Sequence, residues 1–461
     1  MFLAAEGIRN GSVVSCDVCI IGSGAAGITL GLELLGSGRR VAILESGGLE
    51  AAPSPDALYE LESARLPVAH DSRVRAFGGT TTVWSGRWKL HDEIDFLPRE
   101  WVPHSGWPLR RETLLPYYQR AASLLRIPSP EPIPEQAWHS PIIEPTVFAF
   151  QEQRHRDWGA GFRQAFASAP GTQVYLGAHV VRLARSKEAV QHAEVRTLAG
   201  TGFRVEARTF VLATGAIENA RLLLLSDLGN EHDQVGRHYM DHPKATAGVI
   251  EAYRPVDFSR SWAFHSRDGS THVGLRLSDA AEKDHGVLNS HIVLLPLRDR
   301  SILAKLTRSK ATWLVEVRNF MEQAPCPSNR VTLGRDRDLF GCAKARVDWG
   351  VTDLDRKTMV VFHQLLRREC QRLRIGELRS PLLRSGTADF PITKDASHHM
   401  GTTRMGAAPA SSVVDPDCRV HSAANLYLAG SSVFPTSGYA NPTATIAALA
   451  VRLADHLRGI A

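Results

Sequence analysis

The sequence DVCIIGSGAAG, residues 17–27, joins an apolar strand to a G-x-G-x-x-G turn. In such a turn Gly22 permits the sharp bend, Gly24 lets the backbone approach a pyrophosphate, and Gly27 lets the next helix pack closely on the strand. We expect that helix over residues 25–35, with its N-terminal N–H groups and partial positive charge directed at phosphates. The pattern predicts dinucleotide binding, and the alternative is an accidental glycine-rich turn.

A second apolar strand, RVAILE at residues 40–45, decides between these two interpretations. It ends in Glu45, about twenty residues past the turn, where a carboxylate binds a ribose hydroxyl. Strand, helix, strand and terminal acid therefore occur in the order that a dinucleotide-binding unit requires.

The length of 461 residues predicts about two or three domains. The net charge is +6, but basic residues alternate with acidic ones, as in residues 335–338. Such mixing is typical of a solvated surface, so we expect no nucleic-acid partner.

The six cysteines do not have the pattern of a disulfide framework. Cys16 and Cys19 have C-x-x-C spacing, but on a strand residues three apart should face opposite sides, so we expect no redox role and no metal site there. Residues 1–15 lack the charge and apolar core of a signal peptide, and no segment is long enough to span a bilayer. We expect a cytoplasmic protein without a membrane partner.

The middle of the chain alternates between two kinds of pattern. Residues 100–169 are rich in Pro and Trp and contain a predicted helix at 112–125, as in an insertion. Strands follow at 174–176, 178–183, 193–197, 203–207 and 209–213, and a small-residue turn, ATGA at 213–216, leads into a helix at 217–226. Strand-like runs at 245–253, 271–277, 288–297 and 311–317 then predict an antiparallel sheet, followed by a helix at 353–373.

We therefore predict an α/β fold, with a Rossmann-like nucleotide-binding domain and a discontinuous α+β substrate domain built on an antiparallel sheet. The nucleotide-binding domain is assigned to residues 1–100, 172–243 and 396–461. The substrate domain is assigned to residues 101–171 and 244–395.

Polar and small residues gather at three further places. The loop GGTT at residues 78–81 precedes Trp84 and offers hydrogen-bond donors to a phosphate or a polar ring, although it could also be a plain turn. Near the C-terminus His398 and His399 stand before a Gly-rich turn, and a strand over residues 425–432 ends in small residues. Asn441 and Pro442 then have the residue types of a helix N-cap and first helical position, and the N-terminus of that helix suits an anionic acceptor atom.

Together these motifs resemble the glucose-methanol-choline (GMC) oxidoreductases, flavoproteins that oxidise alcohols, over nearly the whole chain. The loop with Trp84 and the residues Asn219 and Ala220 resemble the pyranose 2-oxidase branch, which acts on sugars. In that enzyme the residue before the tryptophan is a histidine that holds the flavin covalently. Here it is Val83, so the resemblance implies FAD bound without a covalent link.

The resemblance also implies a role for each motif. Glu45 would bind the adenosine ribose, the backbone at Val180 the adenine, and Gly22, Gly24 and Gly27 the pyrophosphate. The remaining cofactor-binding positions that it implies are Gly78, Gly79, Thr80, Thr81, Ala213, Gly215, Gly430, Ser431, Pro442 and Thr443.

Alcohol oxidation needs a base that takes the hydroxyl proton while hydride leaves the carbon, and imidazole has a suitable pKa. The resemblance assigns this role to His398, with Asn441 binding the substrate oxygen. His399 is the alternative base, and a purely structural pair of histidines is the third interpretation. The polar residues Arg87, Glu322 and His363 are candidates for substrate contacts without a decisive spacing.

The predicted activity is hydride transfer from a hydroxyl carbon to flavin N5, giving a ketone or aldehyde. The expected substrate is a sugar, glycoside or polyol, and oxygen or another acceptor reoxidises the flavin. The alternatives are a non-sugar alcohol of natural-product metabolism, a non-redox lyase that keeps FAD, and a flavin monooxygenase or amine oxidase. The oligomeric state stays open.

Overall fold

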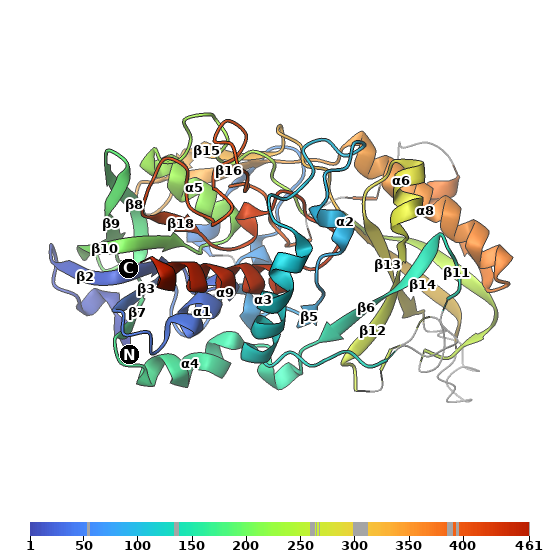
Figure 1. The fold of residues 1–461 in the computed structure, drawn as a ribbon, viewed down its shortest axis with the longest axis horizontal. Helices are drawn as coiled ribbons and strands as arrows, with labels where there is room; N and C mark the ends of the chain where they lie inside the picture. Colours follow the sequence, from blue (N-terminus) through green and yellow to red (C-terminus); the bar gives the residue numbers. More distant parts are fainter. Residues whose placement is uncertain are drawn as a thin grey trace.

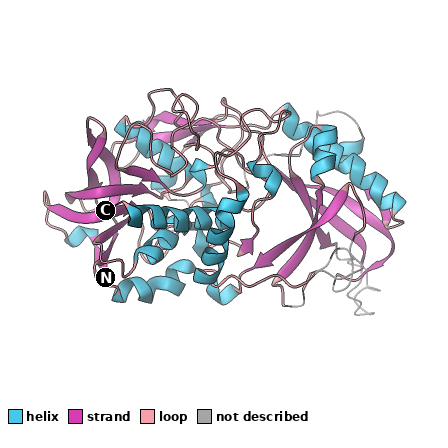
Figure 2. Cartoon of the chain, in the orientation of Figure 1, coloured by secondary structure: helices cyan, strands magenta, loops and turns pink. Residues whose placement is uncertain are grey.

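The computed structural model describes residues 1–52, 56–132, 138–258, 263, 265–266, 268–297, 312–384, 391–392 and 396–460. Figure 1 shows two sheets at opposite ends of the molecule, and Figure 2 shows helices packed between and beside them. Residue 311, where a strand was expected to begin, lies outside the described residues. No helix within these ranges is long and apolar enough to cross a bilayer.

The first sheet has a parallel centre. Its strand order is β1-β7-β3-β2-β10-β9-β8, with β18 also paired to β10. The strands are β1 (Phe2–Ala4), β2 (Val13–Ile21), β3 (Val41–Glu45), β7 (Thr172–Leu176), β8 (His179–Ser186), β9 (Ala189–Arg196), β10 (Gly202–Leu212) and β18 (Leu426–Leu428). All five residues of β3 and the last four of β2 are buried, as expected for parallel strands covered on both faces. The predicted Rossmann-like domain is thereby confirmed.

Strand β10 corrects the prediction of two short strands at 203–207 and 209–213. Its first part, Gly202–Glu206, pairs antiparallel with β9, and its last part, Phe210–Leu212, pairs parallel with β18. Since β2 runs along the other side of β10, the eleven residues remain extended throughout. Local sequence suggested a break where there is only a change of partner.

The C-x-x-C pair lies in β2. Cys16 and Cys19 are both buried free thiols. The Cys16 thiol donates to the Glu206 carbonyl oxygen at 3.7 Å, and the nearby Cys19 thiol lowers the pKa of Cys16. The absence of a redox or metal role for the pair stays a prediction. The amides of Asp17 and Val18 both donate to the carbonyl of Arg40.

Helices cover the first sheet and connect it to the rest of the chain. Helix α1 (Ala25–Leu34) packs beside α9 (Thr443–Gly459), while α3 (Arg111–Leu124) lies against α9 and α4 (Trp158–Ser168) against α1. Gly31 is required at the α1–α4 contact, because a Cβ there would lie 2.8 Å from the Phe166 ring.

The second sheet has seven strands in the order β17-β11-β14-β13-β12-β6-β5, and every neighbouring pair is antiparallel. The predicted antiparallel sheet is confirmed. Its strands are β5 (Arg87–Trp88), β6 (Ile143–Phe150), β11 (Lys244–Val256), β12 (Thr271–Leu277), β13 (Ser290–Pro296), β14 (Thr312–Met321) and β17 (Gly376–Arg379). Helix α8 (Asp353–Arg372) covers one face and starts with a capping box between Thr352 and Asp355. Apolar side chains such as Leu294, Val317 and Phe362 form the core between them.

Several elements lie across the predicted domain boundaries. Strand β5 belongs to the seven-stranded sheet although residues 1–100 were assigned to the nucleotide-binding domain. Helices α3 and α4 pack against the first unit although residues 101–171 were assigned to the substrate domain. The boundaries therefore stay a prediction.

The remaining described elements are short. A three-stranded sheet joins β15 (Arg330–Arg337), β16 (Ala343–Asp348) and β4 (Glu62–Ser63). The other α-helices are α2 (Glu93–Phe96), α5 (Ala216–Ser226) and α6 (Asp279–His285).

Candidate active site

A cavity of about 800 Å³ opens at the carboxyl ends of β2, β3 and β10. This edge of a parallel sheet is where α/β folds bind nucleotides. Most of the predicted site residues line this cavity: Gly22, Gly24, Glu45, Gly79, Thr80, Thr81, Val180, Ala213, Gly215, His398, Gly430, Ser431, Asn441, Pro442 and Thr443. Tertiary structure thus gathers motifs that are more than four hundred residues apart.

The glycines of the first turn have different tasks. Gly22 has φ +97°, and a Cβ there would lie 2.6 Å from the carbonyl oxygen of Ala213. At Gly27 a Cβ would lie 2.1 Å from the carbonyl oxygen of Gly22, whereas at Gly24 it would meet nothing within 4 Å. Gly24 therefore faces open space in the cavity, and Gly27 supports the turn from behind without lining it.

The second glycine loop is organised in a similar way. Gly78 has φ +111° and packs against Gly159, where a Cβ would come within 2.8 Å of the Gly159 nitrogen. Like Gly27, Gly78 is not part of the cavity wall, whereas Gly79, Thr80 and Thr81 are. Because Gly78 and Gly79 have no side chains, the loop packs closely on the backbone of Gly159 and Gly24, and this packing places Thr80 and Thr81 at the cavity.

Three helices begin at the cavity: α1 after Gly24, α5 after Gly215 and α9 after Pro442. None of these N-caps forms a side-chain hydrogen bond to the helix, so a ligand is free to accept from the first N–H groups. FAD fits this arrangement, because its pyrophosphate suits one helix N-terminus and the electron-rich edge of its ring suits another.

Glu45 lies at the buried end of β3. Its Oε2 accepts hydrogen bonds from Ser23 N (3.0 Å) and Ser23 Oγ (2.6 Å), and its Oε1 accepts from Gly47 N (2.7 Å). Burial raises the pKa of this carboxyl, while the hydrogen bonds act in the opposite direction. The carboxylate is held in place at the cavity edge where a ribose would lie.

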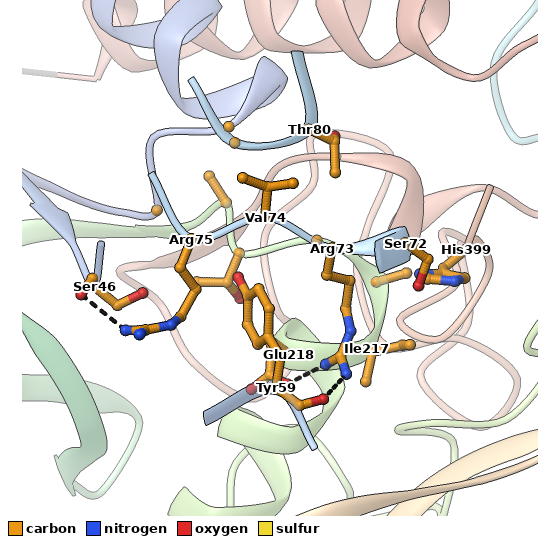
Figure 3. Close-up of a pocket in the computed structure, with 18 of the residues that line it drawn as sticks. Ser46, Tyr59, Ser72, Arg73, Val74, Arg75, Thr80, Ile217, Glu218 and His399 are labelled. Atoms are coloured by element: carbon orange, nitrogen blue, oxygen red, sulfur yellow. Dashed lines mark hydrogen bonds and ion pairs between the residues drawn. The ribbon is translucent and has the colours of Figure 1, made fainter. Parts of the chain in front are cut away.

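One wall of the cavity was missed from sequence. It is formed by Tyr59, Arg73 and Arg75, drawn in Figure 3. Arg73 donates to Glu218 Oε1 (2.8 Å) and stacks on the Tyr59 ring (4.6 Å). Arg75 donates to Asp56 Oδ2 (2.6 Å) and to the Ser46 carbonyl. The alternation of two arginines around Val74 was the only local signal, and the distant partners could not be deduced from it.

His398 forms a hydrogen bond with each of its ring nitrogens. Nε2 lies 3.2 Å from Asn441 Nδ2, and Nδ1 lies 2.9 Å from Nδ1 of His242. Nε2 of His242 lies 3.4 Å from the Ser437 carbonyl oxygen, which can only accept. His242 therefore carries its proton on Nε2 and accepts at Nδ1 from His398, which leaves a lone pair on Nε2 of His398.

Both imidazoles are neutral near pH 7. Burial, with the neighbouring His242, Lys244 and Arg87, holds the pKa of His398 well below its usual range. Burial is also the main reason that the pKa of His242 falls to about 3. A neutral His398 has on Nε2 the lone pair that a general base needs, and in this structure that lone pair accepts a hydrogen bond from Asn441 Nδ2.

Asp241, which sequence reasoning missed, positions this pair. The fully buried carboxylate accepts from the amides of His242 (2.5 Å), Ala396 (3.1 Å) and His398 (3.3 Å). It thereby joins the two histidine-bearing segments across a separation of 157 residues. Adjacent Asp and His residues are too common in sequence to have indicated this.

Other candidate residues have different positions from those expected. Asn441 does not cap α9 with its side chain: the N-cap is Pro442, and the helix begins at Thr443, because the Asn441 amide is used by His398. His399 also lines the cavity, and its ring packs beside that of Tyr239, with ring centroids 5.8 Å apart.

Glu322 and His363, the two other candidates for substrate contacts, do not line the cavity. Glu322 forms a buried ion pair with Arg99, and His363 of α8 hydrogen-bonds Asn319.

Among the described residues, no group of three His, Cys, Asp or Glu side chains is placed to hold a metal ion.

Comparison with known proteins agrees with this geometry. Residues 16–248 match the pyridine nucleotide-disulphide oxidoreductase family, and residues 325–450 match the GMC oxidoreductase family. The 6'''-hydroxyparomomycin C oxidase of Streptomyces lividus is 28% identical over 96% of this chain and 92% of its own. The fructose dehydrogenase large subunit of Gluconobacter japonicus is 29% identical over 55% of this chain and 47% of its own.

A solved structure shows the same fold. Pyridoxine 4-oxidase from Mesorbium loti superposes with a TM-score of 0.61 at 18% identity, over 96% of this chain and 99% of its own. Since the family match, the relatives and the cavity agree, FAD is the cofactor of this protein. The chain belongs to the GMC oxidoreductases and is an FAD-dependent enzyme that oxidises CH–OH groups.

Proposed function

We propose that the protein oxidises a hydroxyl of a sugar, glycoside or related polyol, with His398 as the base and Asn441 binding the substrate oxygen. The observation that carries this proposal is the hydrogen-bonded pair of these two side chains at the cavity, in which Nε2 of His398 accepts from the Asn441 amide. The names of the relatives, an oxidase for a hydroxyparomomycin and a fructose dehydrogenase, support the substrate class.

The reaction begins when the substrate hydroxyl donates to Nε2 of His398 in place of the Asn441 amide, which then binds the substrate oxygen. As the hydroxyl proton moves to this nitrogen, hydride leaves the same carbon and a carbonyl forms. Bound FAD supplies the hydride acceptor, N5 of its ring. The Nδ1–H of the resulting imidazolium donates to the neutral His242, so the new positive charge is hydrogen-bonded on the side away from the substrate.

The other site residues have roles that their positions support. Gly22 and Gly24 at the α1 N-terminus would hold the pyrophosphate, and Glu45 the adenosine ribose. The N-terminus of α9 at Thr443 would stabilise negative charge on the ring when it is reduced. Gly27 and Gly78 would act through packing.

We propose that FAD is held without a covalent link. The residue before Trp84 is Val83, whose aliphatic side chain cannot form a bond to the flavin ring, and it lines the cavity. Acid precipitation of the purified protein should release all of its flavin into the supernatant, and flavin retained in the pellet would contradict this.

Anaerobic stopped-flow mixing with a panel of sugars, glycosides and polyols tests the activity. Loss of the oxidised flavin band identifies the substrate, and a repeat with oxygen or an artificial dye identifies the acceptor. A non-redox lyase that keeps FAD is the alternative, and it would turn over its substrate without bleaching the flavin.

A further inference from the structure

The face of the seven-stranded sheet opposite α8 carries aromatic and basic side chains. Strand alternation puts Val317 and Leu294 under α8 and their neighbours on the other side. That side carries Phe148 and Phe150 of β6, His272 of β12, His291 of β13 and Phe320 of β14. Figure 1 shows it facing the first sheet.

This face reaches the loop that carries Asn441. The Tyr439 ring, two residues before Asn441, lies 4.6 Å from the ring of His291, and the Tyr439 hydroxyl hydrogen-bonds Thr146 Oγ1 at 2.7 Å. His291 in turn stacks on Phe320, with ring centroids 5.3 Å apart. The aromatic face is therefore in continuous contact with the proposed site of oxidation.

Arg87 of β5 lies within this face. Its guanidinium carbon is 4.9 Å from the ring centroid of Phe148, 5.3 Å from that of Phe150 and 5.4 Å from that of Phe320. Its Nε is buried without a hydrogen-bond partner, and no ion pair to Arg87 is found among the residues that the structure describes. By contrast, the buried Arg99 and Arg276 are paired with Glu322 and Asp92.

A cation in such surroundings has lost hydration without gaining a counter-ion. Burial alone lowers the pKa of Arg87 to about 10, which leaves it charged at pH 7. The side chain therefore presents positive charge between these rings and stays half-buried.

The same field reaches the proposed base. Two cations, Lys244 and Arg87, are among the groups that lower the pKa of His398, whereas the neighbouring His242 is itself neutral. Lys244 is exposed at the start of β11 and lines the cavity, whereas Arg87 does not line it but lies over the ring of Phe320, the residue that pairs with Lys244 across β11 and β14. The substrate side of the site is therefore electropositive.

We propose that Arg87, assisted by Lys244, binds a carboxylate of the substrate, so that the enzyme oxidises a hydroxyl of a sugar acid or another polyhydroxy acid. This proposal rests on the proposed function and makes its substrate class more specific. Arginine suits the role because its planar fork donates two parallel hydrogen bonds to one carboxylate. The half-buried Phe320 ring beside it would pack against the C–H face of the substrate, and the anion would offset the partial desolvation of the guanidinium.

The test compares neutral and anionic forms of one carbon skeleton on the FAD-loaded enzyme. The pairs are methyl β-glucoside with methyl β-glucuronide, glucitol with gluconate, and glycerol with glycerate, and glycerol 3-phosphate tests phosphate as the anion. Dissociation constants come from perturbation of the flavin spectrum, and kcat/KM comes from anaerobic flavin reduction.

For at least one pair the acid should be preferred over its neutral partner. Arg87→Met should lower that preference by about 30-fold or more, as expected for a lost charge-assisted contact. Arg87→Lys should restore part of the preference, and the effect should appear mainly in KM and weaken at high salt. Arg126→Met is the matched control, because Arg126 also lies over a ring, that of Phe162 at 5.6 Å, but is exposed away from the cavity.

The proposal is overturned if no carboxylate binds better than its neutral partner, or if Arg87→Met leaves an existing preference unchanged. A preference for glycerol 3-phosphate over glycerate would overturn the assignment to a carboxylate. Tight, Arg87-dependent binding of an acid that never reduces the flavin would support the anion site and contradict the proposed oxidation. Flavin reduction by neutral alcohols alone would support the proposed oxidation and contradict the anion site.

Discussion

Nδ1 of His242 lies 2.9 Å from Nδ1 of His398, and the Ser437 carbonyl on the far side of His242 determines which ring donates. The Ser437 carbonyl thus sets the tautomer of His242, and His242 in turn sets the tautomer of the proposed base, His398. His242 is a positioning residue, because it acts on the substrate only through His398.

Removal of the base should stop the chemistry without releasing FAD. We expect His398→Ala to slow flavin reduction by about 10³-fold, the usual size of a general-base effect, with the flavin content unchanged. Stopped-flow reduction measures the rate. His399→Ala is the comparison, and a larger loss there would transfer the base assignment to His399.

His242 should matter through its acceptor nitrogen. His242→Phe should slow flavin reduction by about tenfold or more, because the Nδ1–H of His398 loses its partner and the ring loses its orientation. His242→Asn, whose side-chain oxygen accepts, should recover part of the rate and of the pH profile of the unmodified enzyme. Equal losses in both variants would show that His242 serves packing alone.

The pH dependence has a definite sign. Because the pKa of His398 is lowered by burial and by the basic side chains around it, the neutral base should persist below pH 6.5, the usual imidazole value. The rate of flavin reduction should therefore stay constant from neutral pH downward and fall only in more acidic solution.

Removing a cation near His398 should raise the pKa of His398 and so move the pH at which flavin reduction slows toward neutral. Lys244→Met lets the imidazolium form more easily, so the acid limb should shift to higher pH. Lys283→Met, on the exposed side of α6, should leave the profile in place. An unchanged profile in Lys244→Met would contradict the assignment of the acid limb to His398.

Gly24 and Gly27 allow cofactor binding to be separated from folding. A Cβ at Gly24 enters open cavity space, so Gly24→Val should fold with an unchanged circular dichroism spectrum but bind FAD at least about tenfold more weakly. A Cβ at Gly27 collides with the Gly22 carbonyl, so Gly27→Ala should destabilise the fold itself. Loss of folding in both variants would refute the assignment of Gly24 to cofactor binding and of Gly27 to folding.

Glu282 offers a test of stability with a known sign. It is fully buried in α6, neither carboxylate oxygen has a hydrogen-bond partner among the described residues, and burial raises its pKa well above the usual value. The folded state therefore retains a proton that the unfolded state releases, so stability is lost as pH rises above the unfolded pKa, about 4.3.

Glu282→Met should remove this loss. The free energy by which the variant is more stable than the unmodified protein should be about 1–3 kcal/mol larger at pH 8 than at pH 4. Thermal unfolding at both pH values measures it, and Asp284→Asn on the exposed side of the same helix is the control. A pH-independent difference would show that Glu282 remains ionised.

Residues close together in the chain determined much of this protein. The G-x-G-x-x-G turn with Glu45, the helix starts and most of the strands were predictable, because local sterics, glycine conformation and strand patterning specify them. The motifs also sufficed to indicate the family, the cofactor and His398 with Asn441 as candidates.

Only tertiary structure decided what lies next to these residues. His242 and Asp241 lie beside His398 because the backbone bridge between Met240 and Met400 brings two distant segments together, and no local pattern encodes that contact. The pKa of His398 is likewise a sum over burial and charges from three separate segments. Local chemistry therefore indicated the reaction, whereas packing determined the protonation of the proposed base and which charged groups surround it.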